Sequence, residues 1–97
     1  MSPRPTTTDE LEELLLATGQ RHHQAFAASN GHDPDWALWY ADHMVDRLNT
    51  VLDAELTRSD LVYLLVGLSH EQPMMAPGGS WPRFYARTLA VRYGVTQ

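Results

Sequence analysis

Proline and glycine divide this chain of 97 residues into short segments, and this division is the strongest limit on its fold. Breaks fall at Asn30-Gly31, at Asp33-Pro34, within residues 71–80 and at Gly94. Between the breaks, apolar residues recur every three or four positions, as in amphipathic helices. The expected helices span residues 9–29, 34–52, 58–70 and 81–93.

Four helices with short connections predict an all-α fold, a compact and mostly antiparallel four-helix bundle. Residues 1–7 are expected to be a flexible tail and residues 8–97 a single helical domain, since a chain of this length supports one core. By periodicity alone, the apolar run at 61–68 fits a buried strand as well as a helix. The capping-box pattern from Thr57 to Asp60 favours the helix.

Capping residues indicate where the first two helices begin. Thr8 or Asp9 is expected to cap the first helix. The second is expected to begin with Asp33 at the N-cap and Pro34 in the first turn.

Residues 71–80 are expected to form a loop, because two prolines and a Gly-Gly pair oppose regular structure. We expect this loop to be mobile and to gate any neighbouring site, with Met74 and Met75 covering its mouth. The alternative is an ordinary connection whose methionines pack at the edge of the core.

Composition excludes several function classes. Ten acidic residues and three arginines in residues 1–55 give −7, and two acidic residues and four arginines in residues 56–97 give +2, so we expect no nucleic-acid binding. The absence of cysteine rules out disulfides and thiolate chemistry. No apolar run approaches the roughly 18 residues of a membrane span, and no signal peptide is evident, so we expect a cytoplasmic protein.

Lysine and isoleucine, which have AT-rich codons, are absent, and this favours a GC-rich bacterial genome.

Aromatic residues are concentrated in the second expected helix, where the segment from Asp33 to His43 carries two tryptophans and a tyrosine. If these rings converge with others from the third and fourth helices, they form either the core or a pocket for a flat apolar ligand. The core is preferred, because a small domain needs large side chains to bury enough area. The candidate ligand-binding rings are Trp36, Trp39, Tyr40, Tyr63, Trp81 and Tyr85.

Two histidines are candidate proton carriers. His43 and Asp46 are three residues apart on a helix, so the carboxylate could orient the imidazole and raise its basicity. With Tyr40 one turn back, the pair would form a general acid–base group beside an aromatic floor, although a surface ion pair is the preferred interpretation. His22, on the inner face of the first helix, is the second candidate.

No metal ion and no cofactor are expected. His22 and His23 are adjacent and point in different directions on a helix. The Glu-x-x-His spacing of di-iron bundles does not occur. A site built across His22, His43 and His70 with a carboxylate is the alternative, and no ligand spacing supports it.

Arg83 and Arg87 follow the expected helix start at Ser80, where free amides and guanidinium groups could hold an anion. The segment matches no phosphate-binding fingerprint. We therefore expect these arginines to pair with the acidic first half of the chain.

The third expected helix is apolar around nearly its whole circumference, because leucine and valine fill six of the eight positions at 61–68. Three neighbouring helices in so small a domain will not cover every side. A homodimer is therefore expected.

Several segments resemble a group of small bacterial proteins. The matching patterns are Trp36 to Ala41, Arg47-Leu48, Leu56 to Leu65 and Trp81 to Tyr85, and the likeness extends over about three quarters of the chain. The resemblance implies one compact helical domain. No activity is attached to the group, so the resemblance implies no site.

Two function classes follow. The preferred hypothesis is a non-catalytic accessory or protein-interaction module, because no motif specifies chemistry. The alternative is a small-molecule-binding protein or a cofactor-free enzyme, with an aromatic and histidine-lined pocket between helices.

Overall fold

The computed structural model describes residues 7–30, 33–75 and 80–93, and these residues form helices joined by short turns. No strand occurs among them, so the expected all-α class is confirmed. A short 3-10 helix, η1 (Ala27–Ser29), follows the first α-helix. The four α-helices are α1 (Thr7–Ala25), α2 (Trp36–Leu52), α3 (Arg58–Met75) and α4 (Trp81–Arg92).

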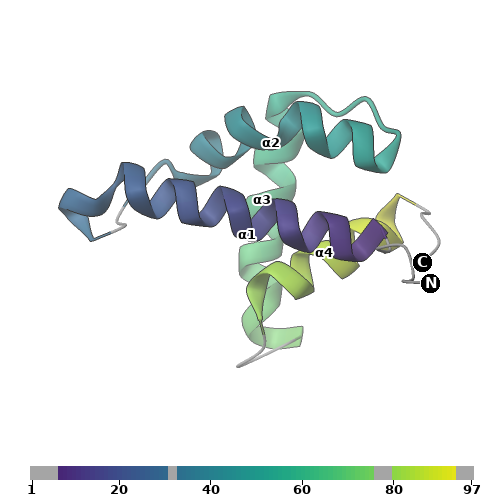
Figure 1. Cartoon of the computed structure of the whole chain (residues 1–97). Helices are drawn as coiled ribbons and strands as arrows, with labels where there is room; N and C mark the ends of the chain where they lie inside the picture. The colour runs from purple at the N-terminus through teal and green to yellow at the C-terminus, as the bar shows by residue number, and fades with distance from the viewer. Residues whose placement is uncertain (1–6, 31–32, 76–79, 94–97) are drawn as a thin grey trace, which may run out of the picture.

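The helices form a compact bundle in which α1 packs between α2 and α4. Figure 1 shows that α2 and α4 each run antiparallel to α1, whereas α3 crosses behind these three helices. The α3 helix packs mainly against α2 and has a smaller contact with α4. The bundle is therefore mostly antiparallel, as expected, with α3 as the exception.

All four helices contribute to one hydrophobic core. On α1, the buried positions are spaced by three or four residues, which confirms the expected inner face. The same spacing appears on α2, α3 and α4. The largest apolar side chains with no exposed surface are Leu11, Leu15, Met44, Leu48, Leu61, Leu65, Leu68 and Leu89.

The start of each of the first two helices differs from the prediction. Thr8 and Asp9 lie inside α1, not at its cap, and Thr8 is buried. The α2 helix begins at Trp36, with Asp35 at the N-cap position. Asp33 is not the cap, because its carboxylate instead accepts a hydrogen bond from the Asp35 backbone N–H and forms a turn before the helix.

The predicted loop at 71–80 is wrong for its first half, because α3 continues through Pro73 to Met75. Pro73 lies in the last turn, so it removes one helical hydrogen bond near an end that frays in any case. Glu71, on this extra turn, pairs with Arg92 of α4 at 2.9 Å. Residues 76–79 and the side chains of Met74 and Met75 lie outside the described residues. The predicted gating of a neighbouring site by this loop therefore stays a prediction.

The connection from α2 to α3 confirms the predicted capping box. The Thr57 backbone N–H donates to Asp60 Oδ2 at 2.9 Å, and the Asp60 N–H donates to Thr57 Oγ1 at 3.1 Å. Asn49 of α2 binds both the N–H and the carbonyl of Leu56 through its side-chain amide, each at 2.9 Å. Asp53 ends α2 in the left-handed conformation, with φ 52°.

None of the helices in the described ranges has the combination of length and hydropathy that crossing a bilayer requires.

Candidate functional site

Two aromatic pairs come together between α2 and α4. Trp36 and Tyr40 are one helical turn apart on α2, and Trp81 and Tyr85 are one turn apart on α4. Residues at this spacing share one helix face. Tyr40 and Trp81 join the two pairs, with ring centroids 6.1 Å apart. The structure thus brings four of the six candidate rings together.

Each ring in this series meets the next edge to face. The interplanar angles are 85° for Trp36 and Tyr40, 76° for Tyr40 and Trp81, and 74° for Trp81 and Tyr85. This arrangement is favourable because the electropositive edge of one ring meets the electronegative face of the next. With Leu65 of α3, the four rings line an open depression of about 200 Å³, which we name the aromatic recess.

Gly19 allows the rings to approach the backbone of α1. A Cβ atom at this position would lie 3.2 Å from Trp81 Cζ2 and 3.2 Å from the Tyr40 hydroxyl oxygen. Such contacts are tighter than ordinary van der Waals packing, so a side chain here would displace a ring. Sequence reasoning missed this residue, because a glycine within a helix does not indicate which side chains lie opposite it.

Burial raises the pKa of both phenols in the aromatic recess. Desolvation is the cause for Tyr40, and for Tyr85 it is followed by the proximity of Tyr40. Because the ordinary pKa of tyrosine is about 10, both phenols are neutral at physiological pH. None of the described residues that line the recess is charged. It therefore presents neutral aromatic rings.

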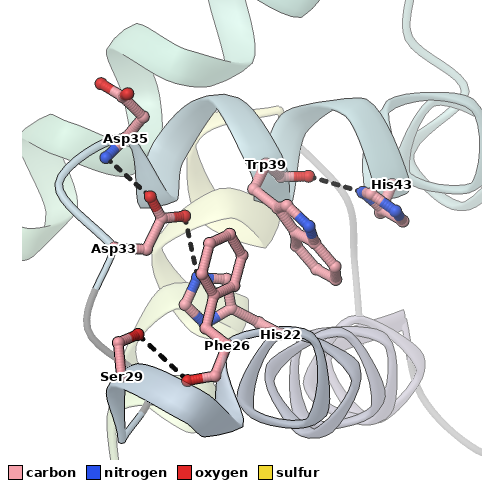
Figure 2. Close-up of polar contacts among 7 residues, drawn as sticks. All are labelled: His22, Phe26, Ser29, Asp33, Asp35, Trp39 and His43. Carbon is pink, nitrogen blue, oxygen red and sulfur yellow. Dashed lines mark hydrogen bonds and ion pairs between the residues drawn. The ribbon is translucent and has the colours of Figure 1, made fainter.

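A buried histidine–aspartate pair lies where α1 meets the start of α2. His22 Nε2 donates to Asp33 Oδ2 at 3.1 Å, and the two side chains are 9% and 8% exposed. Figure 2 shows the His22 imidazole directed at the Asp33 carboxylate, beside the rings of Phe26 and Trp39. The Asp35 N–H holds the other Asp33 oxygen. His22 is thus fixed in orientation by a carboxylate, a typical arrangement for a histidine that transfers protons.

A second, wider depression begins beside His22. It measures about 520 Å³ and is open to solvent. Besides His22, the described residues that line it are Leu16, Gly19, Gln20, His23, Gln24, Tyr40 and Trp81. We name it the α1 groove. Tyr40 and Trp81 border both this groove and the aromatic recess, so the two rings form a shared wall.

His43 is positioned by Trp39, not by Asp46. Its Nδ1–H donates to the Trp39 carbonyl at 2.8 Å, and its ring stacks on the Trp39 indole with centroids 3.8 Å apart and a 13° interplanar angle (Figure 2). His43 and Asp46 are both exposed and make no hydrogen bond or ion pair with each other in the described structure. The predicted His43–Asp46 acid–base pair is therefore not formed.

Two of the candidate rings lie outside the aromatic recess. Trp39 packs beside His22, with ring centroids 5.1 Å apart. Tyr63 lies on the outer side of α3, is 80% exposed and borders a different depression, near Tyr93. Periodicity could not separate Tyr63 from the other rings, because an α3 helix that is apolar on all sides does not reveal its inner face.

The two arginines of α4 have different surroundings. Arg83 pairs with Asp9 at 3.0 Å and Glu12 at 3.2 Å, both on α1, and these hydrogen bonds raise its pKa. The expected pairing with the acidic first half is therefore confirmed for Arg83. Arg87 is exposed and pairs with no carboxylate in the described part of the chain. The structure does not gather the two arginines into an anion site.

Histidine and carboxylate side chains do not gather into a set of three that could hold a metal ion, as far as residues 7–30, 33–75 and 80–93 are concerned. The alternative of a site across His22, His43 and His70 is thus not assembled there. His22 is committed to Asp33, and His43 to the Trp39 carbonyl.

Comparison with known proteins assigns no family to this chain. It matches no protein-family model, and no curated protein or solved structure is significantly similar to it. The resemblance to small bacterial proteins stays a prediction. The function must therefore be argued from the site itself.

Proposed function

We propose that this chain is a non-catalytic protein-interaction module of the bacterial cytoplasm that acts as a homodimer. The observation that carries the proposal is an exposed apolar surface on α3, which we name the α3 strip and define by Val62, Tyr63, Val66 and Gly67. Tyr63 is 80% exposed and Val66 is 38% exposed, although the opposite side of α3 is fully buried. Exposed apolar surfaces of this kind mark interaction sites.

Charge favours a second copy of the chain as the partner of the α3 strip. The chain carries a net charge of −5, so two copies repel each other over most of their surface. Residues 61–70 contain no aspartate, glutamate, lysine or arginine. Two copies related by a twofold axis can therefore bring this surface together without opposing like charges.

Gly67 supports a close helix–helix contact at the same place. A glycine inside a helix costs roughly 0.5–1 kcal/mol relative to alanine. A Cβ at Gly67 would meet nothing within 4 Å, so no neighbour in the described structure requires a glycine there. The backbone of a second helix that crosses at Gly67 would require one.

The oligomeric state of matched variants tests this proposal. We expect Tyr63→Ser and Val66→Ser to shift the chain from dimer to monomer in sedimentation equilibrium at micromolar concentration. Val91→Ser is the control, because Val91 is 79% exposed on α4, and it should leave the dimer intact. Gly67→Ala should stabilise the monomer against urea and at the same time weaken the dimer. A wild-type chain that is monomeric at micromolar concentration contradicts the proposal.

A small-molecule-binding function is the second candidate, and the aromatic recess favours it. Four large rings converge on an open depression instead of closing over it, and such depressions are the usual place for ligands. If the protein is a cofactor-free enzyme, His22 is the proton carrier, because Asp33 holds the proton on Nε2 and leaves Nδ1 to accept one. The first property to test is whether the aromatic recess binds a small molecule at all, whether or not a reaction follows.

A further inference from the structure

We propose that the aromatic recess binds the quaternary ammonium head group of a small organic cation. This inference rests on the second candidate function, small-molecule binding, and is independent of the homodimer. It concerns the depression lined by Trp36, Tyr40, Leu65, Trp81 and Tyr85.

The orientation of the rings carries the argument. Consecutive rings from Trp36 to Tyr85 are tilted by 74–85° to each other, so they form walls that face in different directions around one depression. The face of an aromatic ring is electronegative and attracts a cation within about 6 Å of its centroid, with tryptophan as the strongest partner. Two indoles and two phenols border this depression, with Tyr85 the most deeply buried of the four, and the arrangement is similar to the aromatic cages that recognise quaternary ammonium groups.

The chemistry of the lining selects this kind of cation. In the described part of the chain no carboxylate lines the recess, so a primary ammonium or a guanidinium group would leave its N–H donors without a charged acceptor. A quaternary ammonium group has no N–H donors, so ring faces are sufficient. The described lining residues include no arginine that would repel the ligand, and the net charge of −5 favours the approach of cations.

The size of the recess limits how much of a ligand it encloses. At about 200 Å³ it lies below the roughly 300–1,000 Å³ of most ligand pockets. A trimethylammonium head group with its methyl groups against the rings fits a depression of this kind, and the rest of the molecule extends into solvent. The mouth of the recess is open, so no closing movement is required.

Isothermal titration of the full chain with choline, compared with 3,3-dimethyl-1-butanol, tests the inference. The two probes have the same shape, but the alcohol has a neutral carbon in place of the nitrogen. We expect choline to bind at least about tenfold more tightly than the alcohol, as an attraction between cation and rings predicts. Equal affinity for the two probes overturns the proposed preference for a cation and leaves an apolar small-molecule site. Binding of neither probe overturns the inference, while the proposed dimer is measured separately.

Conservative ring variants locate the binding site. Trp36→Phe and Trp81→Phe keep an aromatic side chain but weaken its attraction for a cation, and each should lower choline affinity about two- to fivefold. Trp39→Phe is the control, because Trp39 lies outside the recess. Tyr40→Phe should leave the affinity almost unchanged, since the ring face and not the hydroxyl binds. An effect of Trp39→Phe equal to that of Trp36→Phe contradicts the location.

A peptide distinguishes the source of the head group. A peptide that carries trimethyllysine should bind more weakly than choline, because ordering its backbone on binding costs conformational entropy. Thermal melting of every variant verifies that the fold is retained. Preference for the methylated peptide over choline overturns the small-molecule assignment.

Discussion

The two connections on either side of α2 are held in opposite ways. In its described part, the connection from α1 contains a buried side-chain pair, His22 with Asp33, enclosed by the rings of Phe26 and Trp39. The connection to α3 depends on several hydrogen bonds between near neighbours, from Asn49 to Leu56 and between Thr57 and Asp60. A buried pair concentrates stability in two side chains, whereas the second connection divides it among small contributions.

The first connection should show the largest effect when one partner is removed. Asp33→Ala leaves His22 buried without its carboxylate, and the Asp35 N–H loses its acceptor. We expect a loss of about 2–3 kcal/mol in the free energy of unfolding, measured by urea denaturation at pH 7, because a buried donor is left unpaired. The double variant His22→Phe with Asp33→Ala should recover part of this loss, because no unpaired polar ring stays buried. A loss below about 1 kcal/mol would show that the pair is solvated.

The largest effect at the second connection is expected for Asn49→Ala. This change removes two hydrogen bonds and leaves the partly buried N–H and carbonyl of Leu56 without their partner. The expected loss is about 2 kcal/mol in the same urea experiment. Thr50→Ala, which removes an exposed hydrogen bond to the Asp46 carbonyl one position along α2, is the matched control and should cost under about 0.5 kcal/mol. Equal losses of stability in Asn49→Ala and Thr50→Ala would contradict the two hydrogen bonds between Asn49 and Leu56.

The capping box should contribute less and should depend on pH. Thr57→Ala is expected to cost about 1 kcal/mol. Hydrogen bonds from the Thr57 backbone and side chain lower the pKa of Asp60 below its usual value. The contribution of the carboxylate is therefore complete above the ordinary aspartate pKa of about 4, and it is lost as the pH falls through the lower pKa of the folded state.

Comparison of the wild type with Asp60→Asn isolates this pH dependence. The variant carries a neutral side chain of the same shape at every pH. Its stability deficit at pH 7 should shrink as the pH falls below about 4. A deficit that stays constant down to pH 2 would mean that the charge of Asp60 contributes nothing.

The smallest effects are expected at the two left-handed residues, one in each connection. Asn30 has φ 57° and Asp53 has φ 52°. Glycine adopts this conformation without strain but loses more entropy on folding, so Asn30→Gly and Asp53→Gly should each change stability by about 0.5 kcal/mol or less. Alanine at either position should cost about 1 kcal/mol. Thermal melting of the four variants shows whether the same substitution changes the melting temperature equally at Asn30 and at Asp53.

Most of the features that the sequence predicted correctly are local ones, and the pairing of Arg83 with Asp9 and Glu12 of α1 is the exception. The capping box spans four consecutive residues, and its geometry follows from their identity alone. The inner face of α1 follows from its three- and four-residue spacing. In both cases one helix contains all the residues that determine the outcome, so no knowledge of the neighbouring helices is needed.

The features that the sequence could not predict depend on partners from other helices. His22 and Asp33 are eleven positions apart, and their contact depends on how α1 meets α2. Asp33 satisfies the composition of an N-cap equally well, so its actual partner was not evident. The α3 helix also continues through Pro73, and Glu71 on this turn pairs with Arg92 of another helix.

The wall shared by the aromatic recess and the α1 groove has a thermodynamic consequence. Because Tyr40 and Trp81 border both depressions, a molecule that displaces these rings on one side reshapes the other side. Gly19 sets how far the rings can move toward α1 before they meet its backbone. Occupancy of the recess and of the groove would then be linked by one coupling free energy, and each occupant would change the affinity of the other by the same factor.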